Sequence, residues 1–132
     1  MCKIKYGVLG PLIVQHLDRR NYKLYEPLTY KHPNTIDMVA VPVGFVSDGV
    51  SIHFLRTMGL FVLHSLLVSY GLRAAIIHDY LYRTPHLNYT KQEADDVFKL
   101  ALRADGVSRW RTWVIYQGVN LGGGWAWKKY RN

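Results

Sequence analysis

The sequence has little cysteine, few acidic residues and no apolar run long enough to cross a bilayer, and each shortage excludes a class of protein. Cys2 is the only cysteine among 132 residues, which excludes an internal disulfide framework and a cysteine-rich zinc site. Asp and Glu number 9 against 17 Lys and Arg, so the formal net charge is +8. This charge favours an acidic partner, such as nucleic acid, an anionic surface or an acidic protein.

The most apolar stretch covers residues 58–72, and it is interrupted by His64 and two serines. A helix that crosses a bilayer needs about 17–25 apolar residues. The stretch is too short and too polar for that purpose, so we expect a buried helix and no transmembrane span. The first residues carry lysines but no apolar run follows them, so we expect no secretory signal peptide.

The composition is typical of one folded domain, with 49% hydrophobic and 20% charged residues over residues 1–132. The first part, to about residue 50, favours short strands separated by turn residues. Alternation of apolar and polar side chains or short apolar runs predict strands over 11–17, 22–26 and 37–41.

The remainder, from about residue 51 to 132, predicts helices. We expect helices over about 54–70 and 72–83, a third helix from the capping box Thr90-Lys91-Gln92-Glu93 to Gly106, and a last one over 109–121. Ser108 is expected to cap the last helix, and Gly122-Gly123-Gly124 to end it. The predicted class is α+β: a small N-terminal antiparallel β-sheet followed by a C-terminal bundle of three to four helices.

The pair His78-Asp79 is the most distinctive local feature. A histidine can act as a general base near neutral pH, and an aspartate can bind a hard cation such as calcium or magnesium. The alternative is structural: Asp79 and Arg83 are four residues apart and can form an ion pair on a helix, while His78 can be a buried histidine bonded to a carbonyl.

Asp48 lies between Ser47 and Ser51, in a glycine-bounded loop that follows the third predicted strand. An aspartate in such a loop can bind a metal ion or orient a histidine. It is also a common residue in turns and at the start of helices, which is the simpler interpretation.

Asp95 lies in a run of carboxylates at the start of the third helix, where the helix dipole favours negative charge without any chemistry. Its position beside the apolar face nevertheless allows it to point inward. The short link over 84–89 predicts antiparallel packing of the two helices that it joins. We therefore expect Asp95 to approach His78 and fix the tautomer of its ring.

The histidines and the basic aromatic C-terminus give weaker signals. The six histidines show no closely spaced ligand pair, so zinc is compatible with the sequence but not required by it. Aromatic and basic residues alternate over 109–113 and 125–131, a combination that can stack on bases and bind phosphates. The same pattern also suits a helix that buries Trp113 and Tyr116 and exposes its basic residues.

Several blocks of the chain, in order, resemble the phage and prophage family called domain of unknown function 1353 (DUF1353). The blocks cover residues 41–52, 70–82, 91–98 and 116–123, and the family usually has arginine where Lys91 stands. The resemblance implies a phage or prophage origin, and hence a location in the host cytoplasm or the virion. It marks as shared polar positions Asp48, His78, Asp79 and Asp95.

A His-Asp pair followed by tyrosine, with a later aspartate on an antiparallel helix, is also similar to phospholipase A2. That similarity suggests a hydrolase in which His78 activates water, Asp95 orients His78, and Asp48 with Asp79 binds calcium, magnesium or zinc. The substrate would be a cell-envelope component, lipid or peptidoglycan. One alternative is a non-catalytic tail or baseplate protein whose partners are other phage proteins. A further alternative is a basic accessory protein that binds nucleic acid or a host factor.

Overall fold

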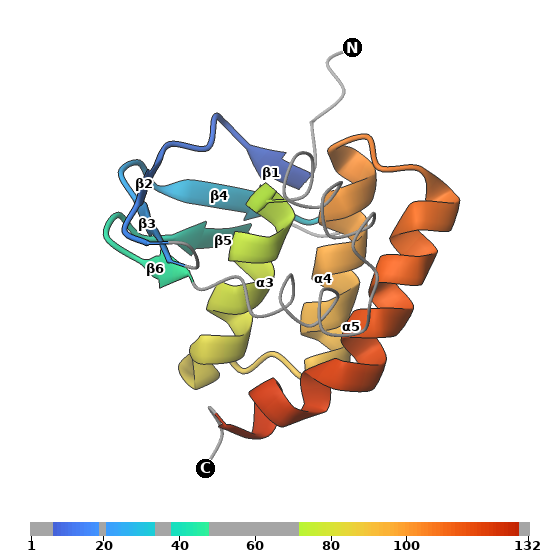
Figure 1. Cartoon of the computed structure of the whole chain (residues 1–132). Helices are drawn as coiled ribbons and strands as arrows, with labels where there is room; N and C mark the ends of the chain where they lie inside the picture. Colours follow the sequence, from blue (N-terminus) through green and yellow to red (C-terminus); the bar gives the residue numbers. More distant parts are fainter. Residues whose placement is uncertain (1–6, 19–20, 34–37, 48–71, 130–132) are drawn as a thin grey trace.

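The structure is a computed structural model that describes residues 7–18, 21–33, 38–47 and 72–129 (Figure 1). Within these residues, short strands come first in the chain and helices follow, which confirms the predicted α+β class. The helix expected over residues 54–70 and the predicted ligand Asp48 lie outside the described residues. No helix in the described part is long and apolar enough to cross a membrane.

The described strands form two three-stranded antiparallel sheets rather than the single sheet that we expected. The first has the order β1-β4-β5, with bounds Gly7–Leu9, Leu28–Lys31 and Met38–Val41. The second has the order β2-β3-β6, with bounds Val14–His16, Tyr22–Leu24 and Val46–Ser47. The chain thus divides its short strands between two sheets.

The sequence prediction located β2, β3 and β5 but missed the other three strands. Strand β4 was not predicted because it ends at Lys31, beside Pro33 and Asn34, which are typical turn residues. Strands β1 and β6 are only three and two residues long, too short to show an alternating pattern of their own.

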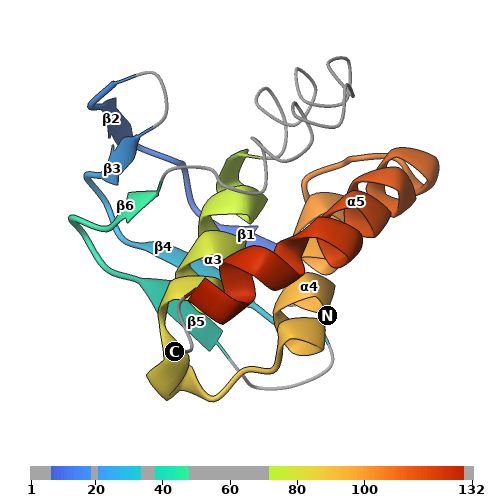
Figure 2. The same cartoon turned by 60° about the horizontal axis from the view of Figure 1, so that its bottom comes forward.

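Three α-helices and one short 3₁₀ turn complete the described structure. Their bounds are Leu72–Arg83 for α3, Pro85–Leu87 for the 3₁₀ turn η1, Lys91–Ala104 for α4 and Arg109–Lys129 for α5. Helix α3 contacts β4, β5 and β6 on one side and α4 on the other, and α5 packs against α4 (Figure 2). Helix α3 therefore lies against strands of both sheets, and α4 also contacts β1.

Helix α4 begins and ends where the sequence predicts. The Thr90 hydroxyl accepts the N–H of Glu93, and the Glu93 carboxylate accepts the N–H of Thr90, so the expected capping box is present. Gly106 adopts a φ of +94° directly after the end of the helix, a conformation that glycine takes without strain. These two signals fix the ends of the element that carries Asp95.

Helix α5 differs from the prediction in two respects. It begins at Arg109 as expected, but the buried hydroxyl of Ser108 makes no hydrogen bond and therefore does not cap it. It also continues through Gly122–Gly124 to Lys129 instead of ending at the glycines. Glycine costs a helix only about 1 kcal/mol relative to alanine, so contacts such as that of Trp127 with Tyr82 can offset the cost.

The hydrophobic core lies where α3 meets the first sheet and α4. Its largest fully buried apolar side chains come from β3, β4 and all three α-helices: Leu24, Leu28, Tyr30, Ile76, Ile77, Leu81, Phe98, Leu102 and Ile115. Buried polar side chains also lie in this region, and they include three of the residues that the sequence analysis singled out.

Candidate functional site

Asp95 of α4 is the centre of a buried polar cluster. His78 Nε2 lies 2.8 Å from its Oδ1, and the Tyr82 hydroxyl donates to the same oxygen at 2.6 Å. The Lys91 ammonium donates to Oδ2 at 2.8 Å. We call His78, Tyr82, Lys91 and Asp95 the Asp95 cluster. Asp95 is 0% exposed and His78 is 1% exposed, so both are removed from bulk water.

These donors keep Asp95 ionised despite its burial. Burial by itself raises the pKa of the Asp95 carboxyl, but hydrogen bonds from His78, Lys91 and Tyr82 and the charge of His78 outweigh burial and hold the pKa below its ordinary value. An ionised carboxylate only accepts hydrogen bonds. Nε2 of His78 therefore carries the proton of this hydrogen bond.

Aromatic rings set the orientation of the His78 ring. The ring centroid of Tyr82 lies 4.2 Å away, and that of Phe98 lies 4.8 Å away. His78 and Tyr82 are one turn apart on α3, whereas Phe98 comes from α4. The imidazole is thus held by packing as well as by its bond to Asp95.

Helix α5 supports the same cluster from a third direction. Lys91 donates to the backbone carbonyl of Asn120 at 3.1 Å, so one ammonium joins α4 to α5. The Trp127 ring meets the Tyr82 ring edge-on, with centroids 5.2 Å apart. The continuation of α5 past its glycines is what brings Trp127 to this position.

Asp79, the neighbour of His78, belongs to a separate group. The Ser47 hydroxyl of β6 donates to its Oδ2 at 2.8 Å, and Arg83 Nε forms an ion pair with its Oδ1 at 3.1 Å. Arg83 also donates from Nη1 to the Val46 carbonyl at 3.1 Å. We call Ser47, Asp79 and Arg83 the Asp79 cluster. It joins the end of β6 to α3.

The expected contact between His78 and Asp95 is therefore present in the structure. The expected ion pair of Asp79 with Arg83 is also present, although Asp79 is only 4% exposed and the pair is therefore partly buried. Adjacent helical residues point about 100° apart, which explains why His78 and Asp79 have different partners. Whether His78 and Asp95 are catalytic stays a prediction.

The described residues around Asp79 do not form a cation site as they stand. Carboxylate and hydroxyl oxygens are suitable ligands for calcium or magnesium, but the guanidinium of Arg83 already occupies Oδ1 and repels a cation. Among the described residues, no group of three or more His, Cys, Asp or Glu is arranged to hold a metal ion.

Sequence reasoning missed two partners. Lys91 lies four residues before Asp95, a spacing that indicates an ion pair on a helix and was available in the sequence. Ser47 was noted only as a neighbour of Asp48. Its bond to Asp79 joins residues 32 positions apart, and no local pattern predicts such a contact.

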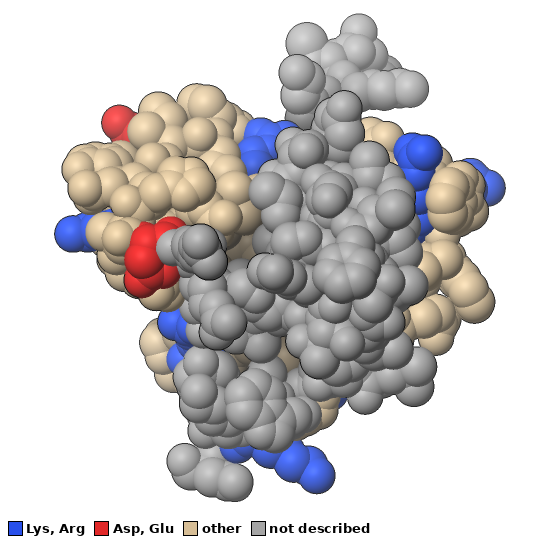
Figure 3. All heavy atoms as spheres, viewed as in Figure 1, with Lys and Arg blue, Asp and Glu red and all other residues tan. Residues whose placement is uncertain are grey.

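The aromatic and basic start of α5 lies apart from both clusters. Trp110 and Trp113 are 61% and 58% exposed, so the expected burial of Trp113 is wrong. The Arg111 guanidinium lies 5.0 Å from the Trp110 ring centroid. Figure 3 shows Lys and Arg atoms at the edge of the molecule where α5 begins. This region presents aromatic and positive groups to solvent.

Comparison with known proteins gives one match. Neither the curated proteins nor the solved structures contain a match to the chain. One family model matches residues 22–119, a span that includes both sheets except β1 and β2, all of α3 and α4, and the first half of α5. Because this span is well over half of the chain, the protein belongs to the family described as protein of unknown function (DUF1353).

Proposed function

We propose that the protein is a hydrolase in which His78 is the general base and Asp95 orients it. The observation that carries this proposal is the 2.8 Å contact between His78 Nε2 and Asp95 Oδ1. A carboxylate bonded to one ring nitrogen fixes the tautomer and stabilises the imidazolium that forms when the other nitrogen takes a proton. Tyr82 and Lys91 hold the carboxylate in place.

The proposed reaction is hydrolysis of an ester or amide. Nδ1 of His78 takes a proton from water while the water oxygen bonds to the carbonyl carbon. The imidazolium then returns the proton to the leaving oxygen or nitrogen as the bond to that atom breaks. As substrate we propose a component of the cell envelope, lipid or peptidoglycan, and as origin a phage or prophage, with the protein in the host cytoplasm or the virion.

The test compares His78→Gln with the control His86→Ala, a change at an exposed histidine of η1. Wild type and both variants are incubated with a fluorescent phospholipid and with labelled peptidoglycan, and thermal midpoints are recorded in parallel. We expect His78→Gln to lose at least 100-fold in rate while remaining folded, and His86→Ala to keep its rate. If a folded His78→Gln variant retains the wild-type rate, the general-base role is wrong.

Cation binding by Asp48 and Asp79 remains part of the proposal. Because Arg83 and a cation compete for Oδ1 of Asp79, we expect any binding to be tighter in Arg83→Gln than in wild type. The measurement is the thermal midpoint in chelator and then with added calcium, magnesium or zinc. A midpoint that none of the three ions changes, in wild type or in Arg83→Gln, would contradict the cation role.

The near-complete burial of His78 and Asp95 favours a second candidate, a non-catalytic virion protein. In this alternative the Asp95 cluster and the Asp79 cluster only join the helices and the sheet, and the partners are other phage proteins. It predicts a large loss of stability in His78→Ala, no hydrolysis by wild type, and a fixed copy number of the protein in purified particles.

The exposed Trp110 beside Arg111 favours a third candidate, binding to nucleic acid or to another acidic surface. The test is the affinity for single-stranded DNA in 50 mM and 200 mM salt, with Trp110→Ala and Arg111→Ala as variants. A weak affinity that does not fall with salt would contradict this candidate.

A further inference from the structure

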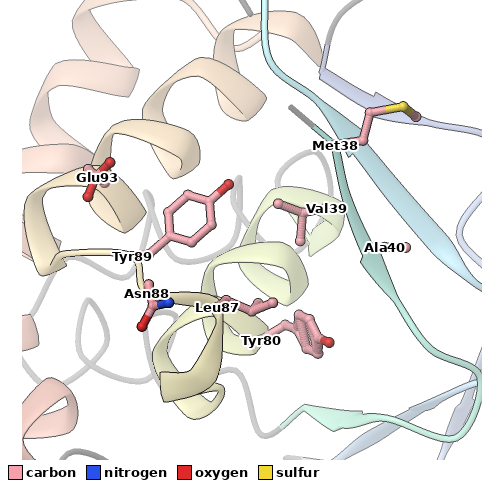
Figure 4. Close-up of a pocket in the computed structure, with 8 residues that line it drawn as sticks. All are labelled: Met38, Val39, Ala40, Tyr80, Leu87, Asn88, Tyr89 and Glu93. Atoms are coloured by element: carbon pink, nitrogen blue, oxygen red, sulfur yellow. The ribbon is translucent and has the colours of Figure 1, made fainter. Parts of the chain in front are cut away.

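The protein has a pocket of about 400 Å³ that is separate from the Asp95 cluster. None of the residues of that cluster lines the pocket. It is bounded by strand β5, helix α3, the turn η1 and the start of α4 (Figure 4). Its size falls within the range of small-molecule sites. The described residues that line it are Met38, Val39, Ala40, Tyr80, Leu87, Asn88, Tyr89 and Glu93.

The charges of the pocket argue against an ionic ligand. Among the described residues that line the pocket, Glu93 is the one acidic side chain, and none is Lys or Arg. Phosphates and carboxylates are bound by Arg, Lys or backbone N–H groups, so the lining does not suit an anion. The net charge of +8 opposes the approach of a cation. A neutral polar ligand fits both observations.

The polar groups of the pocket are held in place by the backbone. Asn88 has a φ of 62° and a ψ of 27°, and its N–H donates to the Pro85 carbonyl. It is the one residue other than glycine with positive φ in the described part of the chain. Asparagine adopts this left-handed conformation more readily than most residues, and here it closes the η1 turn. The amide of Asn88 offers both donors and an acceptor to a ligand.

Glu93 is fixed by the capping box, since its Oε1 accepts the N–H of Thr90. A carboxylate accepts several hydrogen bonds at once, so hydroxyl groups of a ligand can donate to the same group. The carboxylate of Glu93 and the amide of Asn88 both line the pocket and come from neighbouring turns (Figure 4). Together they provide acceptors and donors for a ligand rich in hydroxyl groups.

Two tyrosine rings and an apolar wall complete the pocket. Figure 4 shows the Tyr89 ring extending from the start of α4 toward Val39, and the Tyr80 ring extending from α3 toward β5. The Phe45 ring contacts the Tyr80 ring edge-on, with centroids 5.2 Å apart. The C–H face of a sugar ring packs against such aromatic surfaces, while its hydroxyls bond to amides and carboxylates.

The geometry points to a saccharide-binding site in this pocket, with Asn88 and Glu93 bonding the hydroxyls and Tyr80 and Tyr89 contacting the ring. The inference does not depend on the proposed hydrolase activity, because it uses none of the residues of the Asp95 cluster. It assigns neutral sugars as the ligand class of the pocket between β5 and the η1 turn.

The experiment is an NMR titration of the full chain with methyl β-glucoside and with methyl N-acetyl-β-glucosaminide. Inorganic phosphate and tetramethylammonium serve as charged probes of the same pocket. The variant Asn88→Gly removes the amide but tolerates the positive φ. The variant Glu93→Gln removes the charge but keeps a residue that can complete the capping box. Glu26→Gln, at an exposed glutamate that does not line the pocket, is the matched control.

We expect saturable shifts at the lining residues with at least one glycoside. Affinity should fall at least 10-fold in Asn88→Gly and several-fold in Glu93→Gln, and stay unchanged in Glu26→Gln. The absence of saturable shifts with both glycosides would overturn the inference. Equal affinity in Asn88→Gly would also overturn it, and so would tighter binding of phosphate or tetramethylammonium than of either glycoside.

Discussion

Asp95 and Asp79 are both buried carboxylates, but their partners differ in kind. Asp95 accepts hydrogen bonds from His78, Tyr82 and Lys91, and its connections reach α3, α4 and α5. Asp79 has contacts with a serine of β6 and with an arginine one turn away on its own helix. The Asp95 cluster contains an imidazole and an ammonium group, whereas the Asp79 cluster contains a hydroxyl and a guanidinium. The first cluster joins the three helices, and the second attaches the end of β6 to α3.

We expect the largest loss in the free energy of unfolding from Asp95→Ala, and a smaller loss from Asp79→Ala. Asp95→Ala leaves three donors around a fully buried position, and loss of one partner from a buried ion pair costs about 3–5 kcal/mol. Urea unfolding followed by circular dichroism measures the change. If Asp95→Ala loses less free energy of unfolding than Asp79→Ala, Asp95 is not the more important of the two buried carboxylates for stability.

Acid pH should distinguish Asp95 through its lowered pKa. The unfolded aspartate has a pKa of about 3.9, and the native value lies below its ordinary one because the His78, Lys91 and Tyr82 bonds outweigh burial. Stability from this group is therefore complete above the unfolded pKa and is lost as the pH falls through the native pKa. The free energy of unfolding of wild type and Asp95→Asn, measured between pH 6 and 2.5, should show a smaller slope in the variant. Equal slopes would contradict the pKa shift.

Asp79→Ala should have a smaller effect, about 1–3 kcal/mol. The Arg83 side chain is 23% exposed, so its charge can reach water, and its bond to the Val46 carbonyl can remain. Ser47→Ala removes the other partner and provides a check by a double-mutant cycle with Asp79→Ala. The two changes should show clear coupling with each other and none with Tyr82→Phe.

The smallest effect is a gain of stability in Gly124→Ala. Nothing lies within 4 Å of a Cβ added at Gly124, and the residue is inside α5. Alanine is favoured over glycine in a helix by about 1 kcal/mol. We expect a rise of the thermal midpoint, with the Tyr82–Trp127 contact kept. A lower midpoint would show that the glycine run has a role beyond helix continuation.

The helical half could be predicted because its signals are local. The capping box at Thr90, the stop at Gly106 and the short link before α4 act within a few residues. They sufficed to place Asp95 opposite His78. The link between Ser47 and Asp79, by contrast, depends on how β6 meets α3, and no pattern in either segment specifies that meeting.

The two errors in α5 have a different origin. Glycine and serine have strong average preferences at helix ends, and both rules were applied to residues where tertiary contacts decide the outcome. Trp127 has its contact with Tyr82 only if the helix continues through the glycines. The exposure of Trp113 likewise follows from which face of α5 meets α4, a choice that the sequence of α5 alone does not determine.

The short sequence distances within the Asp95 cluster have a consequence for the order of folding. His78 and Asp95 are 17 positions apart, and η1 already turns the chain between them, whereas Ser47 and Asp79 are 32 apart. Local contacts close smaller loops and form early. We therefore expect the hairpin of α3 and α4 to assemble first and the strands to dock later. Changes at Asp95 should then slow refolding, whereas changes at Ser47 should mainly speed unfolding.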